Sequence, residues 1–362
     1  MNQDLALAVL SDIMDWDLER SRKEFAWLQL MSRFKYDGYN DFVAGVRFIE
    51  SLAGWLQQFE APERDAAYSF VKKNLVYFSP AEIQHLIDLV YPDCIRVRLL
   101  RDVAVRVNKP RYLVWSDQAA TGVYRQLLRK SLFFGLSDGA RIDNFRRATA
   151  GIVSNEQVLL ATEIAEGKWN QVLEDLRKAL NDTAARFKFA FLLDDFIGTG
   201  TTLQGKLKRF WRDCQPIVES HFEPEWTVVV HHYIATAAVT KSIMEHVEEL
   251  RQEQGKNGWF RNVEFTFELV LPESLKIDEQ MAEGFWPLIQ KYYNSGIGTV
   301  HTRKGGGKDV RLGFGQCALP LVLEHNTPNN TIPIIWADID GSNGESPMRP
   351  LFRRRQRHSD LA

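Results

Sequence analysis

One thirteen-residue segment constrains the fold of this chain more than any other. Residues 190–202 read Ala-Phe-Leu-Leu-Asp-Asp-Phe-Ile-Gly-Thr-Gly-Thr-Thr. The apolar start predicts a buried strand, and the glycines and threonines at the end predict a turn into a helix. The backbone N–H groups of such a turn can bind a phosphate. Two carboxylates lie between the strand and the turn and can accept hydrogen bonds from a sugar diol, so the segment suits a ribose 5-phosphate.

The segment resembles the signature of type I phosphoribosyltransferases, which bind 5-phosphoribosyl 1-pyrophosphate (PRPP). The resemblance implies that Asp194 and Asp195 are the catalytic-site carboxylates and hold the ribose 2′- and 3′-hydroxyls. It also implies that the 5′-phosphate lies on a loop made of Gly198, Thr199, Gly200, Thr201 and Thr202. Gly198 departs from the family pattern, which more often has a small hydroxyl residue or alanine there. The alternative interpretation is a buried strand and a turn that bind no ligand.

The resemblance implies a reaction as well. A pentosyltransferase of this type displaces pyrophosphate from the anomeric carbon of PRPP, through a state with positive charge on the ribose. Its protein groups position the nucleophile, neutralise the leaving group and exclude water. Mg²⁺ is the expected cofactor, and the sequence assigns no protein side chain to it as a ligand.

Composition indicates a soluble globular protein. The chain has 362 residues, of which 45% are hydrophobic and 25% charged, and its net charge is −2. This balance gives no global electrostatic case for nucleic-acid binding. Cys94, Cys214 and Cys317 are widely spaced and predict neither a disulfide framework nor a zinc site. Because no apolar run reaches the length of a membrane span and no signal-peptide pattern is present, we expect a cytoplasmic protein without membrane contact.

The first 108 residues are expected to form a helical domain. A three-to-four spacing of apolar residues predicts a helix over residues 40–59, with Asn40 as its N-cap. Ser79 and Glu82 form a capping box that opens another helix, which should end near Pro92. This domain carries no catalytic pattern, so we interpret it as a platform or partner surface.

Residues 109–345 are expected to form a phosphoribosyltransferase-like domain with a C-terminal hood, followed by a basic tail over 346–362. Strands predicted over 112–115, 187–193, 226–234 and 262–271 alternate with helices predicted through 127–133, 168–180, 203–211 and 236–252. This alternation predicts an α/β fold with a parallel sheet and flanking helices, which binds ligands at the carboxyl ends of its strands.

Two further site elements have weaker patterns. A pyrophosphate loop is expected at Ser116–Gly122, with Ser116, Asp117, Thr121 and Gly122 as its candidate residues, and an ordinary turn is the alternative. The segment 138–143, with Arg141, is a candidate lid that closes over the pyrophosphate, and a solvated basic helix face is the alternative. His231 and His232, at the end of a strand, are interpreted as packing residues.

The C-terminal region carries a basic glycine-rich loop over 301–308 and a run of asparagines. Asn326, Asn329 and Asn330 are interpreted as turn residues beside Pro328. The alternative is a hood that selects the acceptor base. An apolar strand is expected to lead to Trp336. Arg353–Arg357 is interpreted as a solvated charged end.

Over most of its length the chain resembles a narrower group, the phosphoribosyltransferase-like proteins of bacterial conflict and phage-defence systems, some of which accompany retrons. The resemblance rests on residues 47–56, the PRPP segment and residues 325–336. It implies an effector held inactive by a partner, such as a retron reverse transcriptase that contacts the N-terminal helices. A homo-oligomer is compatible with this interpretation.

Two functional hypotheses follow. In the first, the protein is an enzyme that transfers the phosphoribosyl group from PRPP or a related nucleotide, or hydrolyses the anomeric bond. In the second, it is a non-catalytic regulator that senses a nucleotide in the phosphoribosyl pocket.

Overall fold

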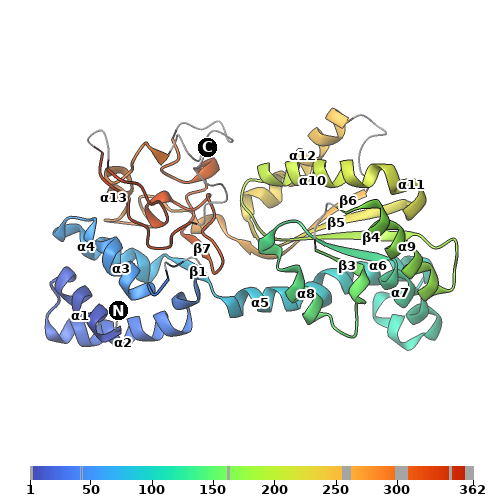
Figure 1. Ribbon diagram of the computed structural model, residues 1–362, viewed down its shortest axis with the longest axis horizontal. Helices are drawn as coiled ribbons and strands as arrows, with labels where there is room; N and C mark the ends of the chain where they lie inside the picture. Colours follow the sequence, from blue (N-terminus) through green and yellow to red (C-terminus); the bar gives the residue numbers. More distant parts are fainter. Residues whose placement is uncertain are drawn as a thin grey trace. The chain divides into compact units, whose positions relative to one another are not determined.

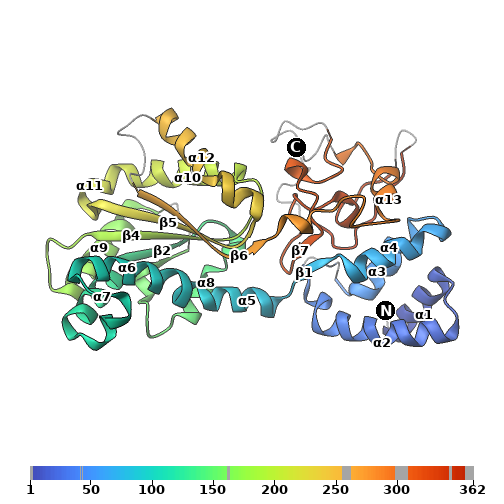
Figure 2. The same cartoon turned by 180° about the vertical axis from the view of Figure 1, so that it is seen from behind.

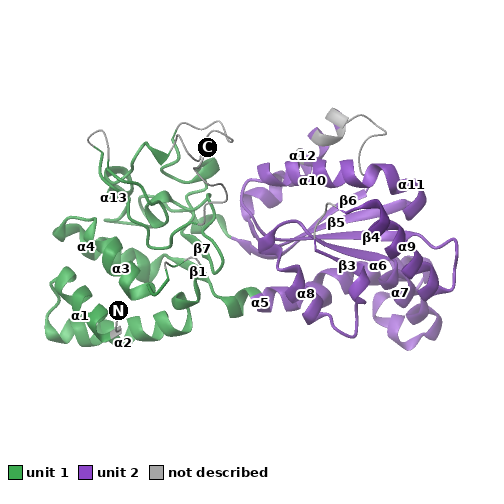
Figure 3. Ribbon diagram, viewed as in Figure 1, with its two compact units in different colours: residues 1–83, 272–362 green, residues 84–271 purple. Residues whose placement is uncertain are grey.

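The computed structural model describes residues 3–40, 42, 44–160, 164–254, 262–297, 309–341 and 345–354. Its contacts divide the chain into two compact units, Met1–Ile83 with Pro272–Ala362 (unit 1) and Gln84–Leu271 (unit 2), coloured in Figure 3. The boundary expected at residue 108 therefore falls inside unit 2, and the one expected at residue 345 falls inside unit 1. The physical reason is that residues 84–107 pack with the large sheet, whereas the C-terminal segment packs with the N-terminal helices.

Unit 2 is built on a five-stranded sheet in the order β3-β2-β4-β5-β6, in which every neighbouring pair is parallel. The strands are β2 (Ser131–Gly135), β3 (Val158–Leu159), β4 (Phe187–Ile197), β5 (Phe222–Thr236) and β6 (Asn262–Leu271). Figure 1 shows helices on both faces of this sheet. The predicted α/β class with a parallel sheet and flanking helices is confirmed.

The helices of unit 2 divide between the two faces of its sheet. They are α6 (Arg96–Val107), α7 (Gln118–Arg129), α8 (Ile142–Ala148), α9 (Glu166–Leu180), α10 (Thr201–Cys214), α11 (Val218–His221) and α12 (Ala237–Gln254). On one face, alternate strand residues such as Ala190 and Leu192 share a core with α9, α10 and α12. On the other face, Phe133 packs on Phe145 of α8, with ring centroids 5.3 Å apart. Figure 2 shows the same layers from behind.

Two predictions in unit 2 are wrong. Phe133 belongs to β2, which lies between β3 and β4, and not to a helix that continues from Leu128. Tyr112–Trp115 forms no strand, because the segment lies in the 3-10 helix η4 (Arg111–Ser116). The apolar and aromatic residues of η4 resemble those of a buried strand, but only Val114 among them is buried.

Unit 1 combines helices with a two-stranded parallel sheet and an aromatic core. Its elements are α1 (Gln3–Met14), α2 (Leu18–Phe34), α3 (Phe48–Gln57), α4 (Arg64–Lys73), β1 (Val76–Phe78), α13 (Trp286–Lys291) and β7 (Leu321–Leu323). The division between the units falls within α5 (Pro80–Leu89). Phe352 is fully buried and its ring contacts those of Phe48 and Tyr77. The C-terminal segment therefore completes the core of unit 1.

Several local predictions in the helical region can be compared with unit 1. The capping box is confirmed, because the Ser79 N–H donates to Glu82 Oε2 at 2.7 Å and the Glu82 N–H donates to Ser79 Oγ at 3.3 Å. The helix expected from Asn40 is wrong at its start. It begins at Phe48, and the Asn40 side chain instead donates to Glu324 at 2.8 Å. The helix expected to end near Pro92 continues through a π-helical turn, Val90–Ile95, into α6.

The C-terminal predictions have mixed outcomes. The strand expected before Trp336 is wrong, because Pro333–Ile335 forms a 3-10 helix. Leu351 and Phe352, within the segment expected as a basic tail, are buried. The loop 301–308 and residues 355–357 lie outside the described residues. In the part of the chain that the structure describes, no helix combines the length and apolar character needed to cross a membrane.

Candidate functional site

The acidic pair lies near the carboxyl end of β4, where parallel α/β sheets bind ligands. Successive side chains of a strand point to opposite faces of the sheet, so the two carboxylates have different surroundings. Asp194 is only 2% exposed, whereas Asp195 is half-buried. The structure therefore separates the two aspartates that the sequence presents as a pair.

Asp194 is held by side chains from three other elements. Ser137, which follows β2, donates its hydroxyl hydrogen to Oδ1. The Lys206 ammonium of α10 lies 2.5 Å from Oδ2, and the Nε2 atom of His232, opposite on β5, lies 3.8 Å from it. Burial raises the pKa of Asp194 to about 6, and the nearby Asp195 charge also raises it, while Lys206 opposes the shift. Asp194 thus joins β2, β4 and α10 at one point.

His232 is an uncharged neighbour of this carboxylate. It is 1% exposed, and burial lowers its pKa to about 3, helped by the Lys206 charge. His231, on the opposite face of β5, accepts or donates a hydrogen bond at 2.9 Å to Thr266 Oγ1 and is also held neutral by burial. Both histidines are packing residues in that they are buried, but His232 also borders the acidic pair.

The predicted phosphate loop forms the turn from β4 into α10. Gly200 is the N-cap of α10 and has φ +82°, a backbone conformation that favours glycine. The Gly198 carbonyl accepts a 2.8 Å hydrogen bond from Thr236 Oγ1, which fixes the turn against β5. The first N–H groups of a helix have no partner inside the helix, so those that begin at Thr201 are available to an anion.

The loop after β2 lies beside the acidic pair. Its first residue, Leu136, donates its N–H to the Leu193 carbonyl at 2.9 Å. The segment 138–140 is a 3-10 helix, and Tyr233 of β5 donates its hydroxyl to the Ala140 carbonyl at 2.5 Å. Arg141 has φ +45° and is the N-cap of α8. The segment predicted as a lid therefore begins with a 3-10 helix that is hydrogen-bonded to β5.

The residues expected to form a pyrophosphate loop lie elsewhere. Ser116 ends η4, and Asp117 is the N-cap of α7, where it accepts a hydrogen bond from the Ala120 N–H. Thr121 and Gly122 lie inside α7, and the Thr121 hydroxyl donates to the Val114 carbonyl at 3.1 Å. The Asp117 side chain therefore caps α7, and the Thr121 hydroxyl connects α7 to η4. The structure does not place these residues at the carboxyl end of a strand. The loop that follows β2 is the one beside the acidic pair.

The asparagines of the C-terminal region form turns in unit 1. The Asn326 N–H donates to the Leu323 carbonyl at 3.0 Å, and the Asn329 carbonyl accepts from the Phe314 N–H at 2.7 Å. The Asn330 amide donates to the Phe314 carbonyl at 3.1 Å. These bonds agree with the interpretation as turn residues.

The oxygen atoms near the acidic pair fit a metal ion that binds together with a phosphate ligand. Among the described residues, no three His, Cys, Asp or Glu side chains cluster closely enough to hold a metal. Mg²⁺ in nucleotide sites is often held by phosphate oxygens and waters with only one or two carboxylates. Half-buried Asp195 fits that smaller role. Asp194 does not fit a metal-binding role, because its two carboxylate oxygens already accept hydrogen bonds from Ser137 and Lys206.

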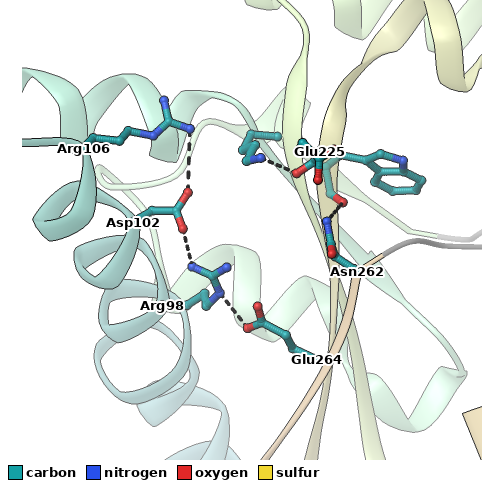
Figure 4. Close-up of polar contacts among 8 residues, drawn as sticks. Arg98, Asp102, Arg106, Glu225, Asn262 and Glu264 are labelled. Carbon is teal, nitrogen blue, oxygen red and sulfur yellow. Dashed lines mark hydrogen bonds and ion pairs between the residues drawn. The ribbon is translucent and has the colours of Figure 1, made fainter.

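A separate polar cavity of about 410 Å³ lies between α6 and the amino ends of β4, β5 and β6 (Figure 4). Arg98 donates to Glu264 at 2.6 Å and to Asp102 at 2.7 Å, and Arg106 lies 3.7 Å from Asp102. These charges neutralise one another. Since ligands of parallel sheets bind at the opposite, carboxyl edge, we do not assign the ribose phosphate to this cavity.

Comparison with protein families gives one match. The model of the family described as PRTase-CE matches residues 52–354, well over half of the chain. The chain belongs to the PRTase-CE family. No curated protein and no solved structure matches it. The phosphoribosyltransferase-like character expected from residues 190–202 is confirmed at the level of the family, and the match includes all of unit 2.

In this PRTase-CE protein, the sequence patterns indicated no role for two residues around Asp194, Lys206 and Ser137, and only a packing role for a third, His232. Lys206 lies four residues after Thr202, and its position toward the strand could be expected from the helix period only once α10 is placed on the sheet. Ser137 was missed because β2 was taken for a helix. His232 carried a usable signal, since two histidines in an apolar strand are unusual for a core.

Proposed function

We propose that this protein binds PRPP or a related ribose 5-phosphate nucleotide at the carboxyl end of β4. The observation that carries the proposal is the continuous strand, turn and helix from Leu193 to Thr202. It presents a half-buried carboxylate, Asp195, next to the amino end of a fourteen-residue helix, α10. A sugar hydroxyl and a phosphate on the same ligand are complementary to these two groups.

Within this proposal, the two aspartates have unequal roles. Asp195 is the carboxylate that accepts hydrogen bonds from the ribose. Asp194 is a positioning residue, because its oxygens already accept from Ser137 and Lys206. It fixes the loop after β2 and the first turns of α10 relative to β4, and through them the groups that face the ligand.

The proposed reaction transfers the phosphoribosyl group from PRPP to an acceptor, or to water. The bond from the anomeric carbon to the pyrophosphate oxygen breaks, the bond to the nucleophile forms, and pyrophosphate leaves with the bonding electrons. Mg²⁺, when bound with the substrate, would neutralise charge on the leaving group. The start of the loop after β2, residues 137–139, whose Ser137 side chain bonds to Asp194, is the proposed contact for the pyrophosphate. A charge-stabilising contact of this kind is worth about 3 kcal/mol at the transition state.

Calorimetric titration of the full chain with PRPP and Mg²⁺ tests the proposal. Wild type should bind, and Asp195→Asn should bind at least tenfold more weakly because a neutral amide accepts fewer hydrogen bonds from the diol. Glu174→Gln, an exposed carboxylate on α9, is the matched control and should bind as wild type does. Equal affinity of Asp195→Asn and wild type would contradict the site.

A non-catalytic nucleotide sensor is the second candidate. The observation that favours it is the burial of Asp194, which leaves one carboxylate of the pair to face a ligand. Release of pyrophosphate from PRPP distinguishes the candidates. An enzyme releases it in a manner that depends on Asp195, whereas a sensor binds PRPP and releases none.

The proposal extends to a biological role in phage defence, with a reverse transcriptase as partner of the N-terminal helices, as the family resemblance of the sequence implies. Plaque assays on cells that carry the chain with its neighbouring genes test this role. Protection that Asp195→Asn abolishes would support an effector that acts through the phosphoribosyl site. Absence of protection by both the wild-type chain and Asp195→Asn would contradict the role.

A further inference from the structure

The 3-10 helix η4 presents an unusual group of apolar side chains to solvent. Tyr112 is 79% exposed, Trp115 is 51% exposed and Leu113 is 42% exposed. In a 3-10 helix, residues i and i+3 lie above one another, about 6 Å apart, so Tyr112 and Trp115 share one face. The Trp115 ring is supported from below by Tyr124 of α7, at a centroid distance of 4.8 Å. Two aromatic rings are thus exposed on one face, and one of them, Trp115, packs on a buried ring.

The chain around η4 is strongly basic, although the whole protein is not. Residues 96–130 contain nine lysines and arginines, two aspartates and no glutamate, in a protein of net charge −2. Lys109 and Arg111 precede Tyr112 closely in the chain, and Arg125 follows Tyr124. All three side chains are exposed. We call Tyr112, Trp115, Lys109, Arg111 and Arg125 the η4 patch.

Ion pairs neutralise several of these cations. Arg98 pairs with Glu264, Arg129 with Glu156 and Lys130 with Glu223. Asp102 pairs with Arg98 at 2.7 Å, and Asp117 pairs with Lys109 and caps α7. Arg111 and Arg125, by contrast, form no ion pair with any residue that the structure describes. Their charges are therefore available to an anionic partner next to the exposed rings.

We propose that the η4 patch binds single-stranded nucleic acid, with bases on Tyr112 and Trp115 and phosphates on Arg111 and Arg125. Exposed aromatic side chains inside a basic surface are the combination that single-strand binding uses, because stacking tolerates any base and the cations follow the backbone. A duplex fits less well, since its bases are already stacked. An acidic peptide would use the cations but would leave two exposed aromatic rings without a matching group.

The η4 patch is separate from the proposed phosphoribosyl site. In Figures 1 and 2, α7 lies toward the end of unit 2 where α11 leads into β5, whereas α10 begins at the other end. Neither Asp195 nor the phosphate loop takes part in it. The inference therefore goes beyond the proposed function, and loss of one binding activity leaves the other measurable.

Fluorescence anisotropy with a labelled twenty-nucleotide oligothymidylate tests the proposal on the full chain. Wild type should bind, and the logarithm of its affinity should fall with the logarithm of salt concentration with a slope of about −1.4, since the two neutralised phosphates contribute about −0.7 each. Tyr112→Ala with Trp115→Ala should weaken binding at least tenfold, because each stacked base is worth about fivefold or more. Arg111→Gln with Arg125→Gln should make the slope less negative by about 1.4.

A control variant and a competition experiment decide whether the η4 patch binds single-stranded nucleic acid or an acidic peptide. Phe34→Ala, which removes a 75% exposed ring from α2 in unit 1, is the control and should leave binding unchanged. Polyglutamate of the same charge should compete poorly with the oligonucleotide, and competition at equal concentration would overturn the proposal in favour of an acidic peptide. Absence of oligonucleotide binding, or binding that the aromatic double variant retains, would also overturn it. Circular dichroism and thermal unfolding of the same variants confirm that they are folded.

Discussion

Replacement of Lys206 by methionine should destabilise unit 2 in a manner that depends steeply on pH. The substitution keeps the aliphatic stem and removes the ammonium that lies 2.5 Å from Asp194, whose side chain is 3% exposed. Burial already raises the pKa of this carboxyl to about 6 in the folded protein, against about 3.9 in the unfolded chain. Without Lys206, the largest influence that lowers this pKa is lost, so the pKa should rise further.

The sign of the pH dependence follows from proton linkage. A carboxyl whose pKa is raised on folding costs stability as pH rises through its unfolded-state pKa, and the cost becomes constant above its folded-state pKa. In wild type the cost stops growing near pH 6 at about 3 kcal/mol. In Lys206→Met it continues to grow by about 1.4 kcal/mol for each pH unit. The difference between the two proteins should be near zero at pH 5, about 1.4 kcal/mol at pH 7 and about 3 kcal/mol at pH 8.

Native-state hydrogen exchange of β4 peptides, followed by mass spectrometry at pH 5, 7 and 8, measures this difference for unit 2 alone. Lys178→Met, an exposed lysine on α9 of the same unit, is the control and should show no growth with pH. Combining Lys206→Met with Asp194→Asn should remove the pH dependence, because no buried carboxylate is left to titrate. A loss of stability that is equal at pH 5 and pH 8 would refute the assignment of Asp194 and Lys206 as a buried pair.

Three smaller changes test other contacts of the site. Gly200→Ala puts an alanine where φ is +82° and places its Cβ 3.4 Å from side chains of α12. The substitution should cost about 1–2 kcal/mol of stability and weaken ribose 5-phosphate binding in calorimetry. Tyr233→Phe should cost about 1–2 kcal/mol, because the Ala140 carbonyl loses its buried donor, and hydrogen exchange of residues 136–141 should become faster. Ser137→Ala removes a hydrogen bond to the Asp194 carboxylate and should cost about 2 kcal/mol in thermal unfolding at pH 8, and less at pH 5, where the carboxyl is protonated.

The part of the fold that sequence predicts best is the strand–turn–helix of the site. β4 and α10 are long and follow their periods closely, and Gly200 stands where the chain needs a left-handed turn. β5 and β6 are also predicted, because β5 contains the β-branched run Thr227–Val230 and β6 alternates apolar and polar residues. The prediction of β2 failed because it has only five residues and follows α7 after the single residue Lys130, with no glycine or proline to mark the boundary.

The environment of the acidic pair could not be predicted from spacing. Asp194 and Asp195 are adjacent and identical in the sequence, and only the pleat of β4 and the helix above it make one buried and the other half-exposed. The role of Ser137 depends on β2, whose placement beside β4 is a tertiary property. The grouping of the C-terminal segment with the first helices likewise depends on contacts such as Asn40 with Glu324, 284 residues apart.

The most direct test of the central claim is a crystal structure of the chain with PRPP and Mg²⁺. The account predicts the 5′-phosphate on the N–H groups at the start of α10, a ribose hydroxyl on Asp195, and Asp194 still bonded to Lys206. A ligand bound at the amino edge of the sheet, in the cavity beside Arg98, would contradict the account. So would a ribose held by Asp194 with its bond to Lys206 broken.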